Sequence, residues 1–122
     1  MTKPLRIVIV GASGKMGQAL IKEVSKDPAL LLTGAIDQLS STDLGMDAGA
    51  LFGIKTNVII DGDFESIIKT GDCVIDFTRP EASMKYLEVC IKNNIKYVLG
   101  TTGFSDEEKE KISLAAKFIP IC

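Results

Sequence analysis

Apolar runs alternate along the chain with segments in which apolar residues recur at helical spacing. The first run, residues 5–10, is nearly continuous and rich in β-branched side chains, which is typical of a strand buried on both faces of a sheet. Helical spacing follows as far as Asp27 and Pro28, where we expect the helix to end. A second apolar run occupies residues 30–36, so this stretch predicts a strand–helix–strand unit.

The same alternation continues to the end of the chain. Asp63 is placed to cap a short helix, and Pro80 to begin a longer one. Ser105, followed three residues later by Glu108, is a capping-box pattern that opens another helix. The remaining strands are predicted at 58–60, 73–77 and 97–99, the helices at 47–52, 64–69, 80–91 and 105–116, and an apolar strand-like run at 118–122.

This order of elements predicts the fold class. Alternating strands and helices with nearly continuous apolar strands favour an α/β, Rossmann-type, doubly wound and mainly parallel sheet with helices on both faces. The length of 122 residues is that of one domain, residues 1–122. Ligands of such sheets bind beyond the carboxyl ends of the strands, so candidate chemistry is sought there.

Three glycines follow the first strand and lead into the first helix. Gly11, Gly14 and Gly17 have the spacing G-x-x-G-x-x-G. Glycine permits a sharp turn and a close approach of backbone N–H groups to a pyrophosphate, and the start of the helix near Lys15 adds its positive dipole end. The loop therefore predicts a dinucleotide site, although glycines needed only for the turn and for helix packing would show the same sequence pattern. No Gly-Lys-Ser/Thr follows, which excludes the phosphate-binding loop of nucleoside triphosphatases.

Asp37 follows the second strand, 20 residues after Gly17. A carboxylate at this place accepts both hydroxyls of an adenosine ribose and repels a 2′-phosphate. Gln38 is neutral where an arginine would attract that phosphate, whereas Lys15 is near enough to supply charge. The pattern predicts a nicotinamide cofactor, NADH or NADPH, with NADH at least as good.

Two later strand ends carry small hydroxyl residues, glycine and an aromatic side chain. Asp76-Phe77-Thr78-Arg79-Pro80 follows one strand, and Gly100-Thr101-Thr102-Gly103-Phe104 follows the next. An aromatic ring can flank a nicotinamide, and threonine hydroxyls can bind its carboxamide or a substrate. The same residues serve equally well as helix caps and turn packing.

Composition narrows the possible functions. The formal net charge is −2, so nothing indicates binding to nucleic acid or to an anionic membrane. Histidine is absent, which removes the commonest general base and metal ligand, and no metal site is indicated. The three cysteines have no CxxC pair, Cys73 and Cys90 are interpreted as buried core thiols, and the chain has no apolar run of signal-peptide or membrane-helix length. We expect a cytoplasmic protein.

At this point a resemblance becomes specific. The segments 11–17, 44–49, 76–80 and 100–104 together resemble the N-terminal domain of the dihydrodipicolinate reductases of lysine and diaminopimelate synthesis, also called 4-hydroxy-tetrahydrodipicolinate reductases. Asp-Phe-Thr-Arg-Pro and Gly-Thr-Thr-Gly-Phe are far more diagnostic than the glycine loop. The resemblance covers essentially the whole chain and implies hydride transfer from NAD(P)H to give tetrahydrodipicolinate.

The resemblance also implies a role for each segment. The glycine loop would hold the pyrophosphate, Asp37 the adenosine ribose, and the two later strand ends the nicotinamide, with Thr102 nearest the substrate. Ser13 stands where many members have glycine, and Gln38 where a basic residue is common. The expected cofactor-binding residues are Gly11, Ala12, Ser13, Gly14, Lys15, Met16, Asp37, Gln38, Phe77, Thr78, Gly100, Thr101 and Thr102.

The family's acid–base groups and its dicarboxylate-binding segment would lie in a second domain, which also builds a homotetramer. None of these groups is found in this chain, so no catalytic residue is assigned here. The chain stops on the apolar run 118–122, and we expect it to be a fragment that is inactive alone.

Two other functions share the glycine loop. An extended short-chain dehydrogenase needs a Tyr-x-x-x-Lys pair, but Cys90 follows Tyr86 at that spacing and Thr101 follows Tyr97. A non-catalytic nucleotide- or CoA-binding domain would not need Asp37, whose carboxylate indicates a free ribose diol.

Overall fold

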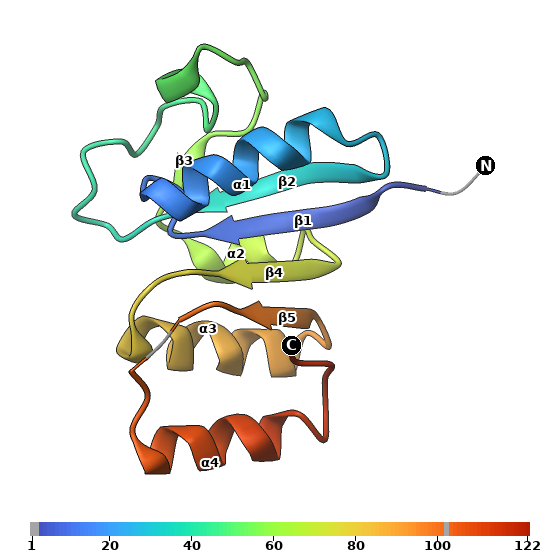
Figure 1. The fold of residues 1–122 in the computed structure, drawn as a ribbon, viewed down its shortest axis with the longest axis vertical. Helices are drawn as coiled ribbons and strands as arrows, with labels where there is room; N and C mark the ends of the chain where they lie inside the picture. Colours follow the sequence, from blue (N-terminus) through green and yellow to red (C-terminus); the bar gives the residue numbers. More distant parts are fainter. Residues whose placement is uncertain (1–2, 102) are drawn as a thin grey trace.

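The computed structural model describes residues 3–101 and 103–122, which form a parallel sheet flanked by helices (Figure 1). Within these residues the sheet has five strands in the order β3-β2-β1-β4-β5, and each neighbouring pair is parallel. The predicted fold class is confirmed. The elements are β1 (Leu5–Val10), α1 (Lys15–Lys26), β2 (Leu30–Ile36), the 3₁₀ helix η1 (Ala50–Phe52), β3 (Ile60–Asp61), α2 (Phe64–Ile68), β4 (Cys73–Asp76), α3 (Pro80–Lys92), β5 (Lys96–Leu99) and α4 (Asp106–Ala115).

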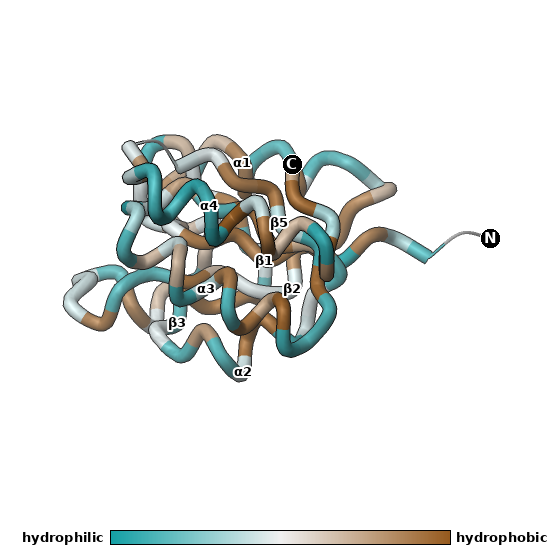
Figure 2. Tube along the Cα trace, turned by 90° about the horizontal axis from the view of Figure 1, so that it is seen from below, coloured by the Kyte–Doolittle hydropathy of each residue, from teal (hydrophilic) through white to brown (hydrophobic). Residues whose placement is uncertain are grey.

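Strand β1 lies at the centre of the sheet, and its residues 7–10 are buried on both faces, as the nearly continuous apolar run predicts. Ile7 and Ile9 pack into one core with residues of α1, whereas Val8 and Val10 pack into a second core with residues of α2 and α3. Figure 2 shows hydrophobic brown along β1 in the middle of the molecule and hydrophilic teal on the outer turns. Helix α1 therefore covers one face of the sheet, and α2 and α3 cover the other (Figure 1).

The strand order reverses at β1, which positions the candidate site. From β1 the chain first proceeds outward through β2 to β3, and then returns to place β4 and β5 on the other side of β1. The loops that leave β1 and β4 consequently diverge at the carboxyl edge of the sheet. A doubly wound sheet opens a crevice at such a switch point.

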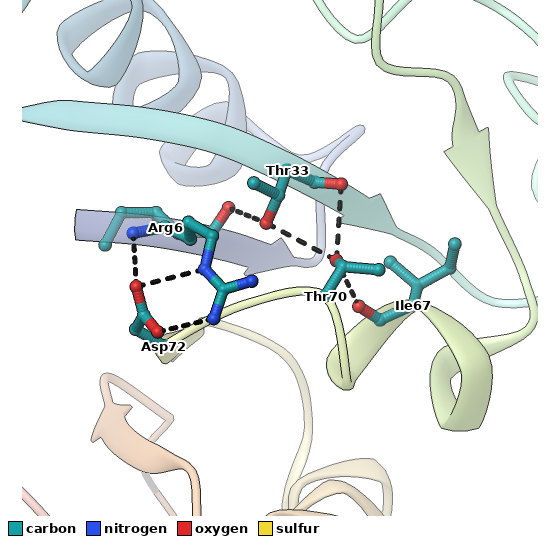
Figure 3. Close-up of polar contacts among 6 residues, drawn as sticks. Arg6, Thr33, Ile67, Thr70 and Asp72 are labelled. Atoms are coloured by element: carbon teal, nitrogen blue, oxygen red, sulfur yellow. Dashed lines mark hydrogen bonds and ion pairs between the residues drawn. The ribbon is translucent and has the colours of Figure 1, made fainter. Parts of the chain in front are cut away.

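At the opposite edge, Arg6 and Asp72 join the start of β1 to the turn before β4 (Figure 3). The Arg6 backbone N–H donates to Asp72 Oδ2 at 2.9 Å, and the guanidinium donates to both carboxylate oxygens, at 3.2 Å from Nε and 2.8 Å from Nη2. These hydrogen bonds from Arg6 lower the pKa of Asp72 to about 2. Beside them, the Thr70 hydroxyl donates to the Ile67 carbonyl at the end of α2 at 2.6 Å and approaches Thr33 Oγ1 of β2 at 3.4 Å.

Several boundaries differ from the sequence prediction. Residues 58–60 were expected in a strand, but β3 comprises only Ile60 and Asp61, because Ile59 bridges antiparallel to Asp47 and residues 45–48 bond to this segment. Strand β4 ends at Asp76 rather than at Phe77, and the predicted helix at 47–52 is the single turn η1.

The apolar run 118–122 lies parallel to β5 but forms only one bridge, between Tyr97 and Ile121. The Tyr97 N–H donates to the Pro120 carbonyl at 3.0 Å, and the Cys122 N–H donates to the Tyr97 carbonyl at 3.0 Å. The helix caps are confirmed. Asp63 accepts from the Ser66 N–H, and Ser105 with Glu108 forms the complete capping box of α4.

Candidate functional site

The glycine loop between β1 and α1 is packed too tightly for any side chain at two positions. A Cβ on Gly17 would lie 2.1 Å from the Gly11 carbonyl oxygen, so only glycine lets the first turn of α1 approach the loop. Gly11 has φ +87°, and a Cβ there would lie 3.0 Å from the Phe77 carbonyl oxygen. The loop is thus held between α1 and the segment that follows β4.

Backbone bonds fix the shape of this loop and leave the start of α1 open. The N–H groups of Gly11 and Ala12 both donate to the Ile36 carbonyl, at 2.9 and 3.0 Å. No side chain caps α1, and within the described residues no hydrogen bond occupies the N–H groups of Lys15 and Met16, its first two residues. Free donors at the positive end of a twelve-residue helix are suited to a phosphate group.

The Asp37 carboxylate joins the end of β2 to the glycine loop. Its Oδ2 accepts from the Ser13 N–H at 2.8 Å, and its Oδ1 accepts from the Gln38 N–H at 2.8 Å. Each carboxylate oxygen can accept more than one hydrogen bond, so lone pairs remain for two ribose hydroxyls. Asp37 is half-buried and faces the same crevice as Gly14.

The crevice is a cleft of about 940 Å³ at the carboxyl edge of the sheet. It brings together seven of the residues predicted to bind the cofactor: Gly11, Ser13, Gly14, Asp37, Gln38, Phe77 and Thr78. The other lining residues were not predicted as site residues; they are Leu39, Ser40, Ser41, Thr42, Gly62, Phe64, Arg79, Glu81, Ala82, Lys85 and Tyr86. A signal for the α3 residues was available, because a helix that begins with Pro80 directly after a strand end points its first turns at this edge.

One wall of the cleft is aromatic and another is charged. The rings of Phe64 and Tyr86 meet edge to face, with centroids 4.8 Å apart. Burial raises the pKa of Tyr86 to about 12, so this phenol stays neutral. Arg79 and Lys85 bring two cations to the same cleft as the Asp37 carboxylate.

The two later strand ends interlock. The Phe77 ring lies directly over Gly100, where a Cβ would come within 2.1 to 2.4 Å of three ring carbons. The Thr78 N–H donates to Asp76 Oδ1 at 2.9 Å and to Thr101 Oγ1 at 3.1 Å. Turn packing is therefore present at both segments, and it places Phe77 and Thr78 on the wall of the cleft.

Some predicted site residues lie beside the cleft rather than on its wall. Ala12 is fully buried and its N–H is occupied, while Lys15 and Met16 are exposed at the start of α1. Gly100 and Thr101 lie behind Phe77 and Thr78, and Thr101 is buried. Thr102, predicted nearest the substrate, is outside the described residues.

A smaller hollow, of about 460 Å³, lies at the amino edge of the sheet. Its charged pair, Arg6 and Asp72, is bonded internally, so the hollow offers a ligand no free carboxylate or guanidinium comparable to Asp37. We therefore assign the candidate site to the cleft at the carboxyl edge.

The cysteines lie apart from this site. Cys73 and Cys90 are buried, and burial raises the pKa of Cys90 to about 12, so neither is a ready nucleophile. Among residues 3–101 and 103–122, no three carboxylate or cysteine side chains are grouped to hold a metal ion. No helix in this part of the chain is long and apolar enough to cross a membrane.

The strand order, the glycine loop and the carboxylate at the end of β2 define a Rossmann-type nucleotide-binding domain. Comparison with known proteins narrows this class, because residues 5–122 match the family described as dihydrodipicolinate reductase, N-terminus. The chain belongs to this family.

Named relatives agree with the assignment. The chain is 47% identical over 118 residues to the 4-hydroxy-tetrahydrodipicolinate reductase of Aromatoleum aromaticum, covering 97% of this chain and 43% of the relative. It is 41% identical over 114 residues to the same enzyme of Neisseria meningitidis serogroup C, covering 93% of this chain and 42% of the relative. A dipicolinate-bound dihydrodipicolinate reductase from Paenisporosarcina sp. TG-14 has a similar structure, with a TM-score of 0.74, 30% identity and coverage of 93% of this chain and 43% of that one. The chain thus spans less than half the length of these relatives.

Proposed function

We propose that this chain binds NAD(P)H in the cleft at the carboxyl edge of its sheet, as the dinucleotide-binding domain of a 4-hydroxy-tetrahydrodipicolinate reductase. The observation that carries the proposal is the hydrogen bond from the Ser13 N–H to Asp37, because it brings the phosphate loop and the ribose carboxylate to one place. The family assignment supports NAD(P)H as the cofactor class.

The residues present fit such a cofactor from end to end. The free N–H groups of Lys15 and Met16, together with Gly11, Ser13 and Gly14, would hold the pyrophosphate. Asp37 and Gln38 would bind the adenosine ribose. Buried Ala12 would hold the glycine loop in place through its hydrogen bond to Ile36. The nicotinamide end would face Phe77 and Thr78, with Gly100 and Thr101 behind them. From the family pattern alone, Thr102 is proposed as the residue nearest the substrate.

The bound cofactor would supply a hydride, and the chain would bind it, orient it and exclude water. A dicarboxylate substrate is proposed because the similar structure from Paenisporosarcina holds dipicolinate. By resemblance to the family, the acid–base groups and substrate contacts would come from the part of the longer relatives that this chain does not span, and that part would also form a homotetramer. Alone, the 122-residue chain is expected to bind NADH without reducing substrate.

We propose that NADH binds at least as well as NADPH. Asp37 would repel a 2′-phosphate, and Gln38 offers it no charge. Lys85 and Arg79 also line the cleft and supply the competing attraction. A cytoplasmic location is proposed from the free thiols of Cys73, Cys90 and Cys122.

Calorimetry on the 122-residue chain tests these proposals. NADH is expected to bind, CoA to bind far more weakly, and Asp37→Ala to weaken NADH about tenfold or more, because charge-assisted hydrogen bonds are lost. Asp43→Ala is the matched control, since this carboxylate belongs to the neighbouring loop but does not line the cleft. Unchanged NADH affinity in Asp37→Ala, or tighter binding of CoA, would contradict the dinucleotide site. NADPH binding more than tenfold tighter than NADH would contradict only the cofactor preference.

A further inference from the structure

The last residue of β4, Asp76, carries a fully buried carboxylate that the proposed binding of NAD(P)H does not use directly. It has 0% exposure and does not line the cleft. The ion pair that the described residues form, Arg6 with Asp72, is at the opposite edge of the sheet and does not involve it. A buried carboxylate without a cation needs a full set of hydrogen-bond donors.

Four donors converge on this carboxylate. Its Oδ1 accepts from the Thr78 N–H at 2.9 Å, from the Thr78 hydroxyl at 2.6 Å and from the Thr101 hydroxyl at 3.4 Å. The Tyr97 hydroxyl donates to Oδ2. Every partner of Asp76 can donate a hydrogen bond, so both oxygens of the buried carboxylate are satisfied.

These bonds connect both strand-end segments to each other and to α3. Thr101 Oγ1 also accepts from the Thr78 N–H at 3.1 Å and from the Ser83 hydroxyl of α3 at 2.9 Å. The Phe77 ring covers Gly100 on the other side of the same junction. The carboxylate thus lies where the loop after β4, the loop after β5 and helix α3 meet.

We propose that Asp76 is a positioning residue for the nicotinamide end of the cofactor. Its carboxylate fixes the positions of Thr78 and Thr101 relative to each other, so that the cleft wall formed by Phe77 and Thr78 keeps one conformation. This inference rests on the proposed binding of NAD(P)H in the cleft. The adenosine end depends on Asp37 and Ser13, neither of which is hydrogen-bonded to the Asp76 network.

The two ends of the cofactor can therefore be tested separately. The probes are NADH and ADP-ribose, which lacks the nicotinamide, and both are titrated into the 122-residue chain by calorimetry. In the unmodified chain NADH is expected to bind more tightly than ADP-ribose. Asp76→Ala is expected to weaken NADH about tenfold while ADP-ribose stays within about twofold, because two or more net hydrogen bonds that order the nicotinamide wall are lost. The enhanced fluorescence of bound NADH is expected to fall with it.

Two further variants distinguish positioning from general stability. Asp76→Asn keeps an acceptor for Thr78 and is expected to restore most of the preference for NADH. Tyr97→Phe removes one donor without touching the cleft and is expected to give a smaller loss that is again confined to NADH. This variant carries the test if Asp76→Ala fails to fold by circular dichroism.

Some outcomes overturn the inference. Equal weakening of NADH and ADP-ribose by a folded variant would make Asp76 a purely structural residue, and no weakening of either would remove its role altogether. If the unmodified chain bound the two probes with equal affinity, the nicotinamide would contribute nothing to binding, and Asp76 would have no nicotinamide to position. Binding of neither probe would instead reject the proposed function itself, and the inference with it.

Discussion

Gly17→Ala tests whether the close contact between α1 and the glycine loop is as tight as the structure indicates. The added Cβ would lie 2.1 Å from the Gly11 oxygen, 2.9 Å from the Gly11 carbonyl carbon and 3.0 Å from Ala12 Cα. All three are backbone atoms, so no side-chain rotation relieves the clash. To reach the 3.4 Å of an ordinary contact, the loop and helix must separate by about 1.3 Å.

The loop has little room to move. The Gly11 N–H is bonded to the Ile36 carbonyl, and the Cβ position of Gly11 is already 3.0 Å from the Phe77 carbonyl oxygen. Overpacking of this kind costs about 1–3 kcal/mol in the free energy of unfolding. Helix propensity acts in the opposite direction, because alanine is more favourable than glycine inside a helix by about 1 kcal/mol. The sign of the measured change in the free energy of unfolding therefore shows whether overpacking or helix propensity dominates.

We expect Gly17→Ala to lower the Tm by roughly 5 °C or more, measured by circular dichroism with parallel urea titration. NADH affinity should fall as well, since the displaced loop carries the proposed pyrophosphate site. Ser113→Ala, at an exposed position of α4, is the control and is expected to be neutral or slightly stabilising. A Gly17→Ala chain as stable as the unmodified one, with NADH binding intact, would refute the argument from close contact.

Three other predictions concern stability and reactivity. Ser105→Ala should lower the free energy of unfolding by about 1 kcal/mol in urea titrations, because it removes half of the capping box of α4; no loss would show that α4 contributes little to cooperative unfolding. Hydrogen bonds, chiefly from the Thr56 N–H, lower the pKa of Asp47 from 3.8 to about 2, so the ionised carboxylate stabilises the folded state above pH 3.8 and this stabilisation is lost as the pH falls through 2. Asp47→Asn should therefore reduce the loss of folding stability between pH 5 and pH 2 in urea titrations. An unchanged dependence of stability on pH would contradict this. Of the three thiols, exposed Cys122 should react rapidly with a disulfide reagent at pH 8 and the buried Cys90 only after unfolding, whereas equally fast reaction would contradict the burial of Cys90.

The central part of the fold was predictable because local pattern and tertiary context agree there. The run at 5–10 has apolar side chains on both sides of the strand, and those of residues 7–10 are buried, on one face by α1 and on the other by α2 and α3. The caps at Asp63 and Ser105 depend on residues within three positions, so sequence spacing was sufficient. The 58–60 strand was displaced because its hydrogen bonds go to residues 45–48, a pairing that no local pattern reveals.

The site was predictable where one backbone turn determines it. The glycine spacing and Asp37 follow from the requirement for close approach at the first strand–helix turn, and the structure brings Ser13 and Asp37 within 2.8 Å. The burial of Asp76 could not be foreseen, because its donors come from Tyr97 of β5 and from Thr101 in the loop after β5, as well as from the adjacent Thr78. The contribution of α3 to the cleft likewise depends on how the helix returns over the sheet.

The bonds that tie the glycine loop to the end of β2 imply a pre-organised cradle. Gly11, Ala12 and Ser13 donate to Ile36 and Asp37, so the loop loses its conformational entropy when the sheet forms rather than when a dinucleotide arrives. Ordering a flexible loop on binding costs free energy and weakens affinity, and this cost is small here because the loop is already ordered. Association should therefore be limited by encounter rather than by loop rearrangement, so the observed rate constant should rise linearly with NADH concentration.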